Sequence, residues 1–327
     1  MNKIRENLSD TAIVQNTSSK PPKGGLRCKA KAMTNATKAK GNKKLAESIM
    51  NALFTICGLA ALAFVIVITA FLLVSGIPAI GKIGFVQFIL GKVWAPTAAS
   101  PLYGILPFIT SSVIGTMGAI LIGVPLGLLC AIYIAKFAPK KFASILGEAV
   151  RLLAGIPSVV YGLVGMIIIV PTVREVFNLP DGATLFSAII VLSIMILPSV
   201  ISVSETAIRA VPKEYEEGSL ALGATEVETY FKVSVPAARS GIAAAVVLGV
   251  GRAIGEAMAV MMVSGNVANM PGLFESVRFL TTAVASEMSY SGGLQRQALF
   301  SIALVLFVFI MLINAALNFF LKRDKEA

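Results

Sequence analysis

The sequence predicts an all-α polytopic membrane protein with six transmembrane helices. Of its 327 residues, 56% are hydrophobic and only 14% are charged, and the mean hydropathy of +0.84 lies outside the range of ordinary soluble proteins. The hydrophobic residues gather in runs close to the ~20 residues with which a helix crosses the hydrocarbon core of a bilayer. These runs lack the two-residue alternation of membrane strands, and an open sheet would leave backbone groups unpaired in lipid.

Six apolar runs give the predicted helices in order. They lie at about 49–77, 107–135, 149–171, 184–204, 241–265 and 297–321. Each is near spanning length, and the first and last are the clearest. The chain is therefore predicted to have a six-span domain over 49–322, with a cytoplasmic loop at 206–240, and a short C-terminal tail at 323–327.

The distribution of Lys and Arg predicts the orientation. If the N-terminus is inside, the segments on the inner side hold 22 of the 28 basic residues. The outer loops hold five, which are Lys82, Lys92, Arg174, Arg278 and Arg296. Because cytoplasmic loops carry the excess of basic residues in membrane proteins, both termini and the loop at 206–240 are predicted to be cytoplasmic.

The segment before the first span carries most of the positive charge. Residues 1–48 hold 11 basic and 3 acidic side chains, which is 8 of the net charge of +11. Because the segment is rich in Lys, contains Pro and Gly and has few large apolar residues, we expect a disordered cytoplasmic tail. A topology signal that contacts anionic lipid explains it better than nucleic-acid binding does. It is also too long for a cleaved signal peptide.

Residue types that the chain lacks argue against catalysis. No His is present, which excludes Ser-His and Cys-His nucleophiles and His-based metal sites. Cys28, Cys57 and Cys130 have no spacing for a metal site or a disulfide framework. No G-x-x-x-x-G-K-[ST] pattern occurs, so the chain has no phosphate cradle for ATP. We expect no catalytic residue, no metal and no cofactor on this chain.

The fifth run contains a glycine-rich stretch and two charges. Residues 246–256 resemble a dinucleotide turn, but the apolar run continues and no acidic residue follows about twenty positions on, so a transmembrane helix explains them better. Within that helix, Gly251 and Gly255 form a small-x-x-x-small face that would let another helix approach.

Arg252 and Glu256 are the most informative charges in the spans. Arg252 would lie roughly 17 Å along the helix, near the middle of the membrane, with Glu256 one turn further on the same face. An Arg at that depth costs at least ~2.5 kcal/mol, so the pair should face the bundle interior or a water-filled pathway. Two interpretations stay open, a salt bridge that locks two helices and a polar site for anion passage. Other polar residues in the spans read as interhelical hydrogen bonds, namely Ser193, Ser199, Asn314 and Asn318.

The polar segment Lys213–Ile242 predicts a compact knob between two spans. Helix propensity resumes after Pro212, and Glu214, Glu216 and Glu217 favour a helix N-terminus. Gly223 then interrupts the helix, and a second short helix runs to Pro236. A knob joined rigidly to two spans can pass the movement of a partner to them. The alternative is an amphipathic connector at the membrane surface.

Spacing and sequence blocks resemble a known family. Glu217, Gly223 and Pro236 stand at the intervals of the E-A-A-x3-G-x9-I-x-L-P loop of ABC importer permeases. Four blocks in order are similar to the PstC-type permeases of the bacterial phosphate ABC importer, namely LLAGIPSVVYGLVG (Leu152–Gly165), ALGATEVETYFKVSVPAARSGI (Ala221–Ile242), GRAIGEAMAVMMVSGN (Gly251–Asn266) and ALFSIALVLFVFIMLIN (Ala298–Asn314). The resemblance implies the type I ABC importer permease architecture in the bacterial cytoplasmic membrane.

The resemblance also implies partners and residue roles. It implies a heterodimer with a second permease subunit, two ATP-binding subunits that carry ATP and Mg, and an extracytoplasmic phosphate-binding protein. Arg252 and Glu256 match charged positions tied to phosphate passage. The loop that contacts the ATPase is matched by Glu217, Gly218, Ser219, Gly223 and Pro236, although Gly218 and Ser219 replace the two alanines of the motif.

Three functions remain open on the sequence. The leading one is a permease subunit of an ATP-driven phosphate importer, and a close variant moves another oxyanion such as sulfate or molybdate. The alternative from another class is a secondary anion transporter without an ATPase. A membrane enzyme is disfavoured by the missing His.

Overall fold

The computed structural model describes the backbone of residues 25–326 and the side chains of residues 47–316 and 319. The chain divides into two compact units, Met1–Val67 and Ile68–Ala327. In the first unit the backbone is helical from Gly25, where helix α1 (Gly25–Ile83) begins. The sequence predicted a disordered tail over 1–48, and residues 25–48 differ from that prediction. Their Lys, Ala and Leu residues are good helix formers that continue the helix of the following apolar run; residues 1–24 lie outside the described part.

The membrane-spanning prediction agrees with the structure in number. Five helical segments are long and apolar enough to cross a bilayer, and a bent pair of helices makes up to six. The five segments are Glu47–Ile83, Leu106–Phe137, Ser158–Val176, Leu185–Arg209 and Gly293–Ala316. The second consists of α3 (Leu106–Ile132) and the π-helix η1 (Tyr133–Phe137), and the third consists of α5 (Ser158–Val164), η2 (Gly165–Ile169) and α6 (Val170–Val176). The first belongs to α1, the fourth is α7, and the fifth belongs to α14 (Gly293–Glu326). The pair is Glu226–Ala237 with α11 (Arg239–Gly255), bent by 71°.

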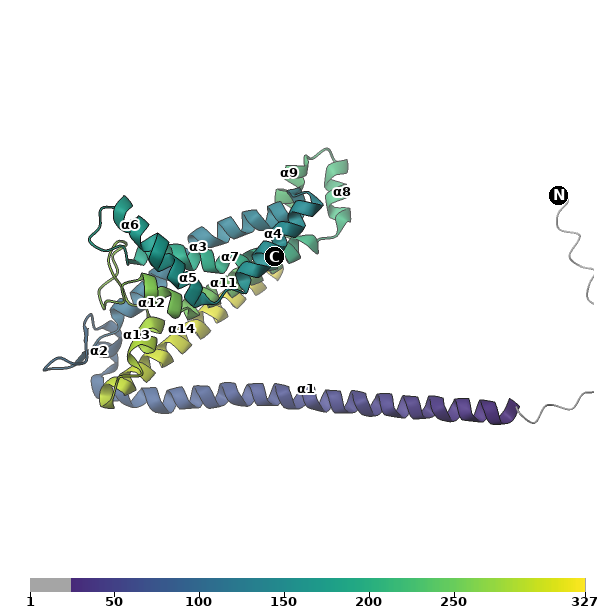
Figure 1. Cartoon of the computed structure of the whole chain (residues 1–327), viewed down its shortest axis with the longest axis horizontal. Helices are drawn as coiled ribbons and strands as arrows, with labels where there is room; N and C mark the ends of the chain where they lie inside the picture. The colour runs from purple at the N-terminus through teal and green to yellow at the C-terminus, as the bar shows by residue number, and fades with distance from the viewer. Residues whose placement is uncertain (1–24, 327) are drawn as a thin grey trace, which may run out of the picture. The chain divides into compact units, whose positions relative to one another are not determined.

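Helices α3, α7 and α11 form the centre of the second unit (Figure 1). Glycines on one side of α3 let α7 approach closely. A methyl group at Gly118 would lie 2.7 Å from the Ile189 side chain, and one at Gly127 would lie 2.8 Å from Val200. Small residues make such close packing possible where lipid supplies no hydrophobic driving force between helices. The sequence analysis passed over this glycine face.

The third span begins later than predicted. Residues 149–171 were expected to be one helix, but Arg151–Ala154 belong to a separate helix, α4 (Lys140–Ala154). Pro157 breaks the helical path, because the residue before a proline is pushed out of the α region, and α5 starts at Ser158. Helix α4 therefore joins two spans.

At one end of the second unit, short helices form the predicted knob. They are α8 (Lys213–Ala221), α9 (Glu226–Thr229), the π-helix η3 (Tyr230–Ser234) and α10 (Val235–Ala237). Figure 1 shows α8 and α9 at the upper right and α2 and α13 at the opposite end. The opposite end holds α2 (Phe85–Leu90), an antiparallel pair β1 (Trp94–Ala95) and β2 (Leu102–Tyr103) with Trp94 opposite Tyr103, α12 (Met258–Val263) and α13 (Leu280–Glu287).

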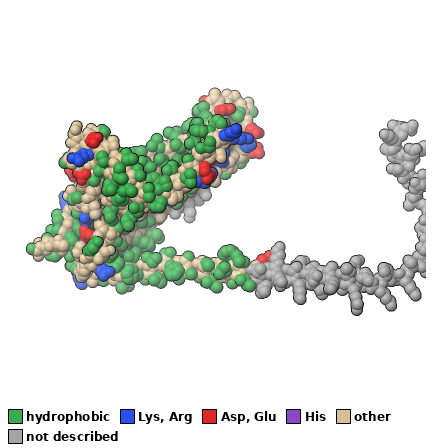
Figure 2. All heavy atoms as spheres, in the orientation of Figure 1, with side chains coloured by type: hydrophobic (Ala, Val, Ile, Leu, Met, Phe, Trp, Pro, Cys, Tyr) green, Lys and Arg blue, Asp and Glu red, His purple; other side chains and the backbone are tan. Residues whose placement is uncertain are grey.

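The surface of the second unit is divided by chemistry. Figure 2 shows charged side chains gathered toward its two ends, with a broad hydrophobic zone between them. Large apolar side chains stay exposed along the spans, for example Leu121 at 70% and Ile167 at 62%. A water-soluble protein would bury such a zone, whereas lipid covers it at no cost. The chain is a multi-pass membrane protein.

Candidate functional site

Helix α11 ends inside the fifth predicted span. Its last residue is Gly255, Glu256 has an extended backbone (φ −74°, ψ 130°), and α12 begins at Met258. The sequence predicted one uninterrupted helix to 265, which is wrong. Glu256 therefore lies outside the helix that carries Arg252, and the expected helical face shared by the two does not exist.

Hydrogen bonds and close packing with neighbouring elements stabilise the break between α11 and α12. The Glu256 carboxylate accepts a hydrogen bond from the Ala259 backbone N–H at 3.0 Å and so caps the start of α12. The Thr281 hydroxyl donates to the Glu256 backbone carbonyl at 2.7 Å, which satisfies a group that the broken helix leaves free. A methyl group at Gly162 of α5 would lie 2.7 Å from the Ala259 Cα atom, so α12 is seated closely on α5.

Arg252 lies half-buried in the last turn of α11 and points to α7. Its guanidinium donates a hydrogen bond to the Ser199 hydroxyl at 3.3 Å. Among the described residues, no ion pair joins Arg252 to Glu256, and Ser199 is the only hydrogen-bond partner of the guanidinium. Because a guanidinium has five N–H donors, most of them make no hydrogen bond within the described residues.

The break explains how two charges are tolerated without pairing. A cation at a helix C-terminus and a carboxylate at a helix N-terminus are each favoured by the helix dipole. Arg252 stands at the end of α11 and Glu256 stands just before α12. The broken helix therefore stabilises both charges separately, without an ion pair between them among the described residues.

Gly251 and Gly255 were predicted to pack against another helix. A methyl group at either would meet no atom within 4 Å in the described part of the chain. Within the described chain, α11 approaches α7 closely at Gly241, where a methyl group would overlap the Ala207 side chain, and at Gly249, where one would lie 3.1 Å from Val200. Gly249 lies on the face of α11 that contacts α7, whereas Gly251 lies on a different face.

The predicted knob forms, with Gly223 at its bend. Gly223 has a φ of +89°, a conformation that side chains rarely adopt, and it separates α8 from α9. The Ser219 and Thr229 hydroxyls hydrogen bond at 2.9 Å and hold the two helices together. Glu217 and Gly218 are exposed on α8. Pro236 was expected to end the second helix, but it lies in α10, and the chain bends only after Ala237.

The outer surface of the knob is apolar at its tip. Leu222 is 92% exposed, and four neighbours also present large apolar area, namely Tyr215, Leu220, Val227 and Phe231. Thr225 and Glu228 form a capping box at the start of α9. Hydrogen bonds from Thr225 and the charge of Lys232 lower the pKa of the Glu228 carboxyl. The knob is thus a rigid element with an apolar tip.

The sequence analysis missed two polar clusters. Near the knob, Lys136 pairs with Glu216 across 80 residues of sequence. At the opposite end, Glu287 pairs with Arg278 and accepts a hydrogen bond from Trp94 at 3.1 Å. No local pattern reveals such pairs, since their partners are brought together only by the fold.

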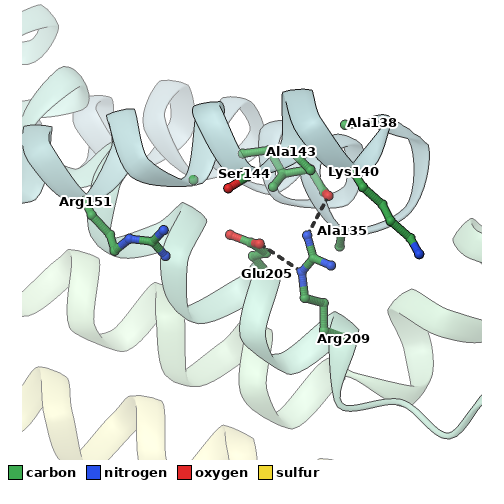
Figure 3. Close-up of a pocket in the computed structure, with 10 residues that line it drawn as sticks. Ala135, Ala138, Lys140, Ala143, Ser144, Arg151, Glu205 and Arg209 are labelled. Carbon is green, nitrogen blue, oxygen red and sulfur yellow. Dashed lines mark hydrogen bonds and ion pairs between the residues drawn. The ribbon is translucent and has the colours of Figure 1, made fainter.

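A cavity of about 380 Å³ lies between α4, η1 and the end of α7 (Figure 3). The Arg209 guanidinium donates to Glu205 at 2.9 Å and to the Ile134 backbone carbonyl at 2.9 Å. Arg209 follows Ser199 by ten residues, which is ~15 Å along a helix. The cavity is therefore separate from Arg252, and Arg209 serves to join α7 to η1.

Comparison with known proteins agrees with this arrangement. Residues 123–324 match the family described as "Binding-protein-dependent transport system inner membrane component". A probable ABC transporter permease protein, YqgH, of Bacillus subtilis (strain 168) is 40% identical over 282 residues, which are 84% of this chain and 91% of that protein. The phosphate transport system permease protein PstC of Haemophilus influenzae is 35% identical over 242 residues, which are 68% of this chain and 76% of that protein.

Solved structures share the fold. A bacterial alginate ABC transporter in complex with its pentasaccharide-bound periplasmic protein gives a TM-score of 0.57 at 15% identity, over 82% of this chain and 92% of the other. The MetNI methionine ABC transporter in an inward-facing conformation gives 0.51 at 19% identity, over 68% and 94%. These likenesses concern the fold alone. Because the family match covers most of the chain, this chain belongs to the inner-membrane components of binding-protein-dependent transport systems, the permease subunits of ABC importers.

Proposed function

We propose that this chain is the transmembrane permease subunit of an ATP-driven importer that moves inorganic phosphate into the bacterial cytoplasm. The observation that carries the proposal is Arg252, a guanidinium with free donors beside a broken helix in a spanning segment. Discontinuous spanning helices form the substrate sites of many transporters. Relatives named phosphate transport permeases, at 30 to 35% identity, support phosphate as the anion.

Arg252 would bind phosphate as a planar fork of donors. Arg matches the tetrahedral oxygens of phosphate with two parallel hydrogen bonds, and such charge-assisted bonds are about twice as strong as neutral ones. Ser199 orients the guanidinium from α7. Glu256, across the break, lowers the net positive charge, so that an anion is held weakly enough to be released.

The knob would receive the ATP-binding subunit. Its motif residues are Glu217, Gly218, Ser219, Gly223 and Pro236, all exposed except the half-buried Ser219, and the apolar tip around Leu222 offers area that a partner can bury. Two such subunits would hold ATP and Mg, a second permease subunit would complete the pathway, and an extracytoplasmic binding protein would deliver the anion. The knob and both termini would lie in the cytoplasm.

Uptake into vesicles tests the proposal. The chain is reconstituted with its neighbouring subunits and the binding protein, and phosphate uptake is measured with and without ATP on the knob side. Uptake that requires ATP, and that sulfate and molybdate do not inhibit, is the expected result. Uptake indifferent to ATP would indicate a secondary transporter, and uptake of sulfate or molybdate instead would change the anion.

A further inference from the structure

A partly buried ion pair attaches the knob to a span that does not adjoin it in the sequence. Lys136 lies in η1 at the end of α3, and Glu216 lies in α8. Their side chains are only 12% and 15% exposed, in contrast to the other ion pairs of the knob end, such as Lys232–Glu228 at 74% and 48%. A partly buried pair holds its two elements more firmly than a fully exposed one, because removing one member leaves the other charge poorly solvated and unpaired.

Glu216 is the centre of a joint between three elements. The same carboxylate oxygen that pairs with Lys136 accepts a hydrogen bond from the Ser234 hydroxyl of η3 at 2.8 Å. The Lys136 ammonium also lies 5.8 Å from the centre of the Tyr230 ring. Phe137 packs edge-on against the same ring at 5.1 Å. Helix α8 and the π-helix η3 of the knob are therefore both bound to the end of α3.

The joint lies where the backbone departs from the α-helix. Lys136 and Phe137 belong to η1, and Tyr230 and Ser234 belong to η3, and both segments are π-helices. Such turns often mark functional positions in helices. Here the wider turn in each helix presents side chains to the other, which places the two elements in contact.

Besides this joint, two bends and a patch of apolar packing attach the knob to the spans. Ala210–Pro212 links α7 to α8, and the 71° bend at Ala238 links α10 to α11. At the base of the knob, Val235 and Ala238 pack in one apolar cluster with Ile134 of η1. The ion pair adds to these a directed attachment of α8 to the end of α3, which limits tilting of the knob against that helix.

The end of α3 is in turn fixed to the helix that orients Arg252. Arg209 of α7 donates to the Ile134 backbone carbonyl in η1 (Figure 3). Further along, Gly127 of α3 lies closely against Val200, the neighbour of Ser199 in α7. Packed interfaces of this kind move as units and do not deform continuously.

We propose that Lys136 and Glu216 are positioning residues that couple the knob to α3, so that a displacement of the knob moves α3 and α7 together with Ser199 and the Arg252 site. This inference rests on the proposed function, since it assigns the route by which ATP hydrolysis on a partner reaches the anion site.

The test measures phosphate uptake and ATP hydrolysis in the same vesicles, with the reconstituted complex carrying Glu216→Gln or Lys136→Met. We expect the amount of phosphate imported per ATP to fall about tenfold, within the range usual for coupling between sites, while hydrolysis stays within about twofold of wild type. Lys232→Met is the matched control, because it removes an exposed ion pair of the same knob, and it should leave the ratio unchanged.

Three results would overturn the inference. The first is an unchanged amount of phosphate imported per ATP in both variants. The second is a parallel loss of uptake and hydrolysis, which would mean that the pair serves only to dock the partner. The third is failure of both variants to assemble. Glu216→Gln keeps the size of the side chain and a hydrogen-bond partner for Ser234, so that folding is preserved. If the wild-type complex itself shows no ATP-dependent uptake, the proposed function fails and not this inference alone.

Discussion

Two regions of the molecule each contain a basic residue and a glutamate. In one region the two residues are close in sequence but do not pair, and in the other they are distant in sequence but form an ion pair. At the break between α11 and α12, Arg252 and Glu256 are four residues apart but do not pair, and each is stabilised at its own helix end. At the knob, Lys136 and Glu216 are far apart in sequence but form a partly buried pair. Paired charges fix two elements together, whereas a cation that is stabilised without a counter-charge remains free to bind an anion.

The largest effect is expected from removing the free cation. Arg252→Leu should lower phosphate uptake at least about 100-fold, because it deletes charge-assisted hydrogen bonds worth up to ~3 kcal/mol. Subunit assembly should persist, since no ion pair within the described chain depends on Arg252. Arg174→Leu, at an exposed arginine of α6, is the control and should transport normally. Normal transport by Arg252→Leu would mean that the anion binds elsewhere.

Distorting the knob should have the next largest effect. Gly223→Val places a branched side chain at a φ of +89°, where such residues are strained by ~1–2 kcal/mol, so uptake should fall about tenfold while the protein still inserts. Gly81→Val is the matched control, because Gly81 lies in α1 outside the knob, has no positive φ and has no atom within 4 Å of an added methyl group. It should transport at least as well as wild type. Full uptake by Gly223→Val would remove the knob from the coupling route.

Weakening the break should have a moderate effect. Thr281→Val removes the hydroxyl that satisfies the Glu256 carbonyl, which costs ~1 kcal/mol and should lower uptake about fivefold. Thr172→Val deletes a similar bond to a backbone carbonyl at an exposed position of α6, and it should have no effect on uptake. Equal losses in both variants would show that the bond has no special role at the break.

The smallest effect concerns pH at the start of α9. Because the folded-state pKa of Glu228 is lowered, its charged form stabilises the cap at neutral pH, and this stabilisation is lost as the pH falls through the folded pKa. A spin label on Val227→Cys should become more mobile between about pH 7 and pH 3. In a Glu228→Gln background the mobility of the label should not change over this range. A label equally sensitive to pH in both backgrounds would rule out the cap as the cause.

Hydropathy predicted the number of spans well because lipid requires long apolar helices. Their ends were predicted less well. The third span starts directly after Pro157, but the apolar residues 152–154 extended the predicted span toward the N-terminus. The end of α11 had no local signal, since Ala257–Val263 continue an apolar run and the break depends on Thr281, which is 25 residues away.

The candidate site was predicted in part for the same reason. Gly223 was found because only a glycine tolerates its backbone conformation, which is a local property. Arg252 was found because a charge in an apolar run is conspicuous. The interhelical hydrogen bond predicted for Ser199 is confirmed. Its donor, Arg252, and the pairing of Lys136 with Glu216 depend on packing between distant helices, so sequence spacing does not predict them.

Exchanging the two charges distinguishes the regions directly. At the knob, combining Lys136→Glu with Glu216→Lys should restore part of the uptake that either change abolishes, because the pair is rebuilt with opposite polarity. At the break, uptake of phosphate is measured for Arg252→Glu combined with Glu256→Arg and for each change alone. The account predicts that the combination recovers nothing, since Arg252 and Glu256 do not act as a pair; recovery toward wild-type uptake would show that they form a salt bridge and would contradict it.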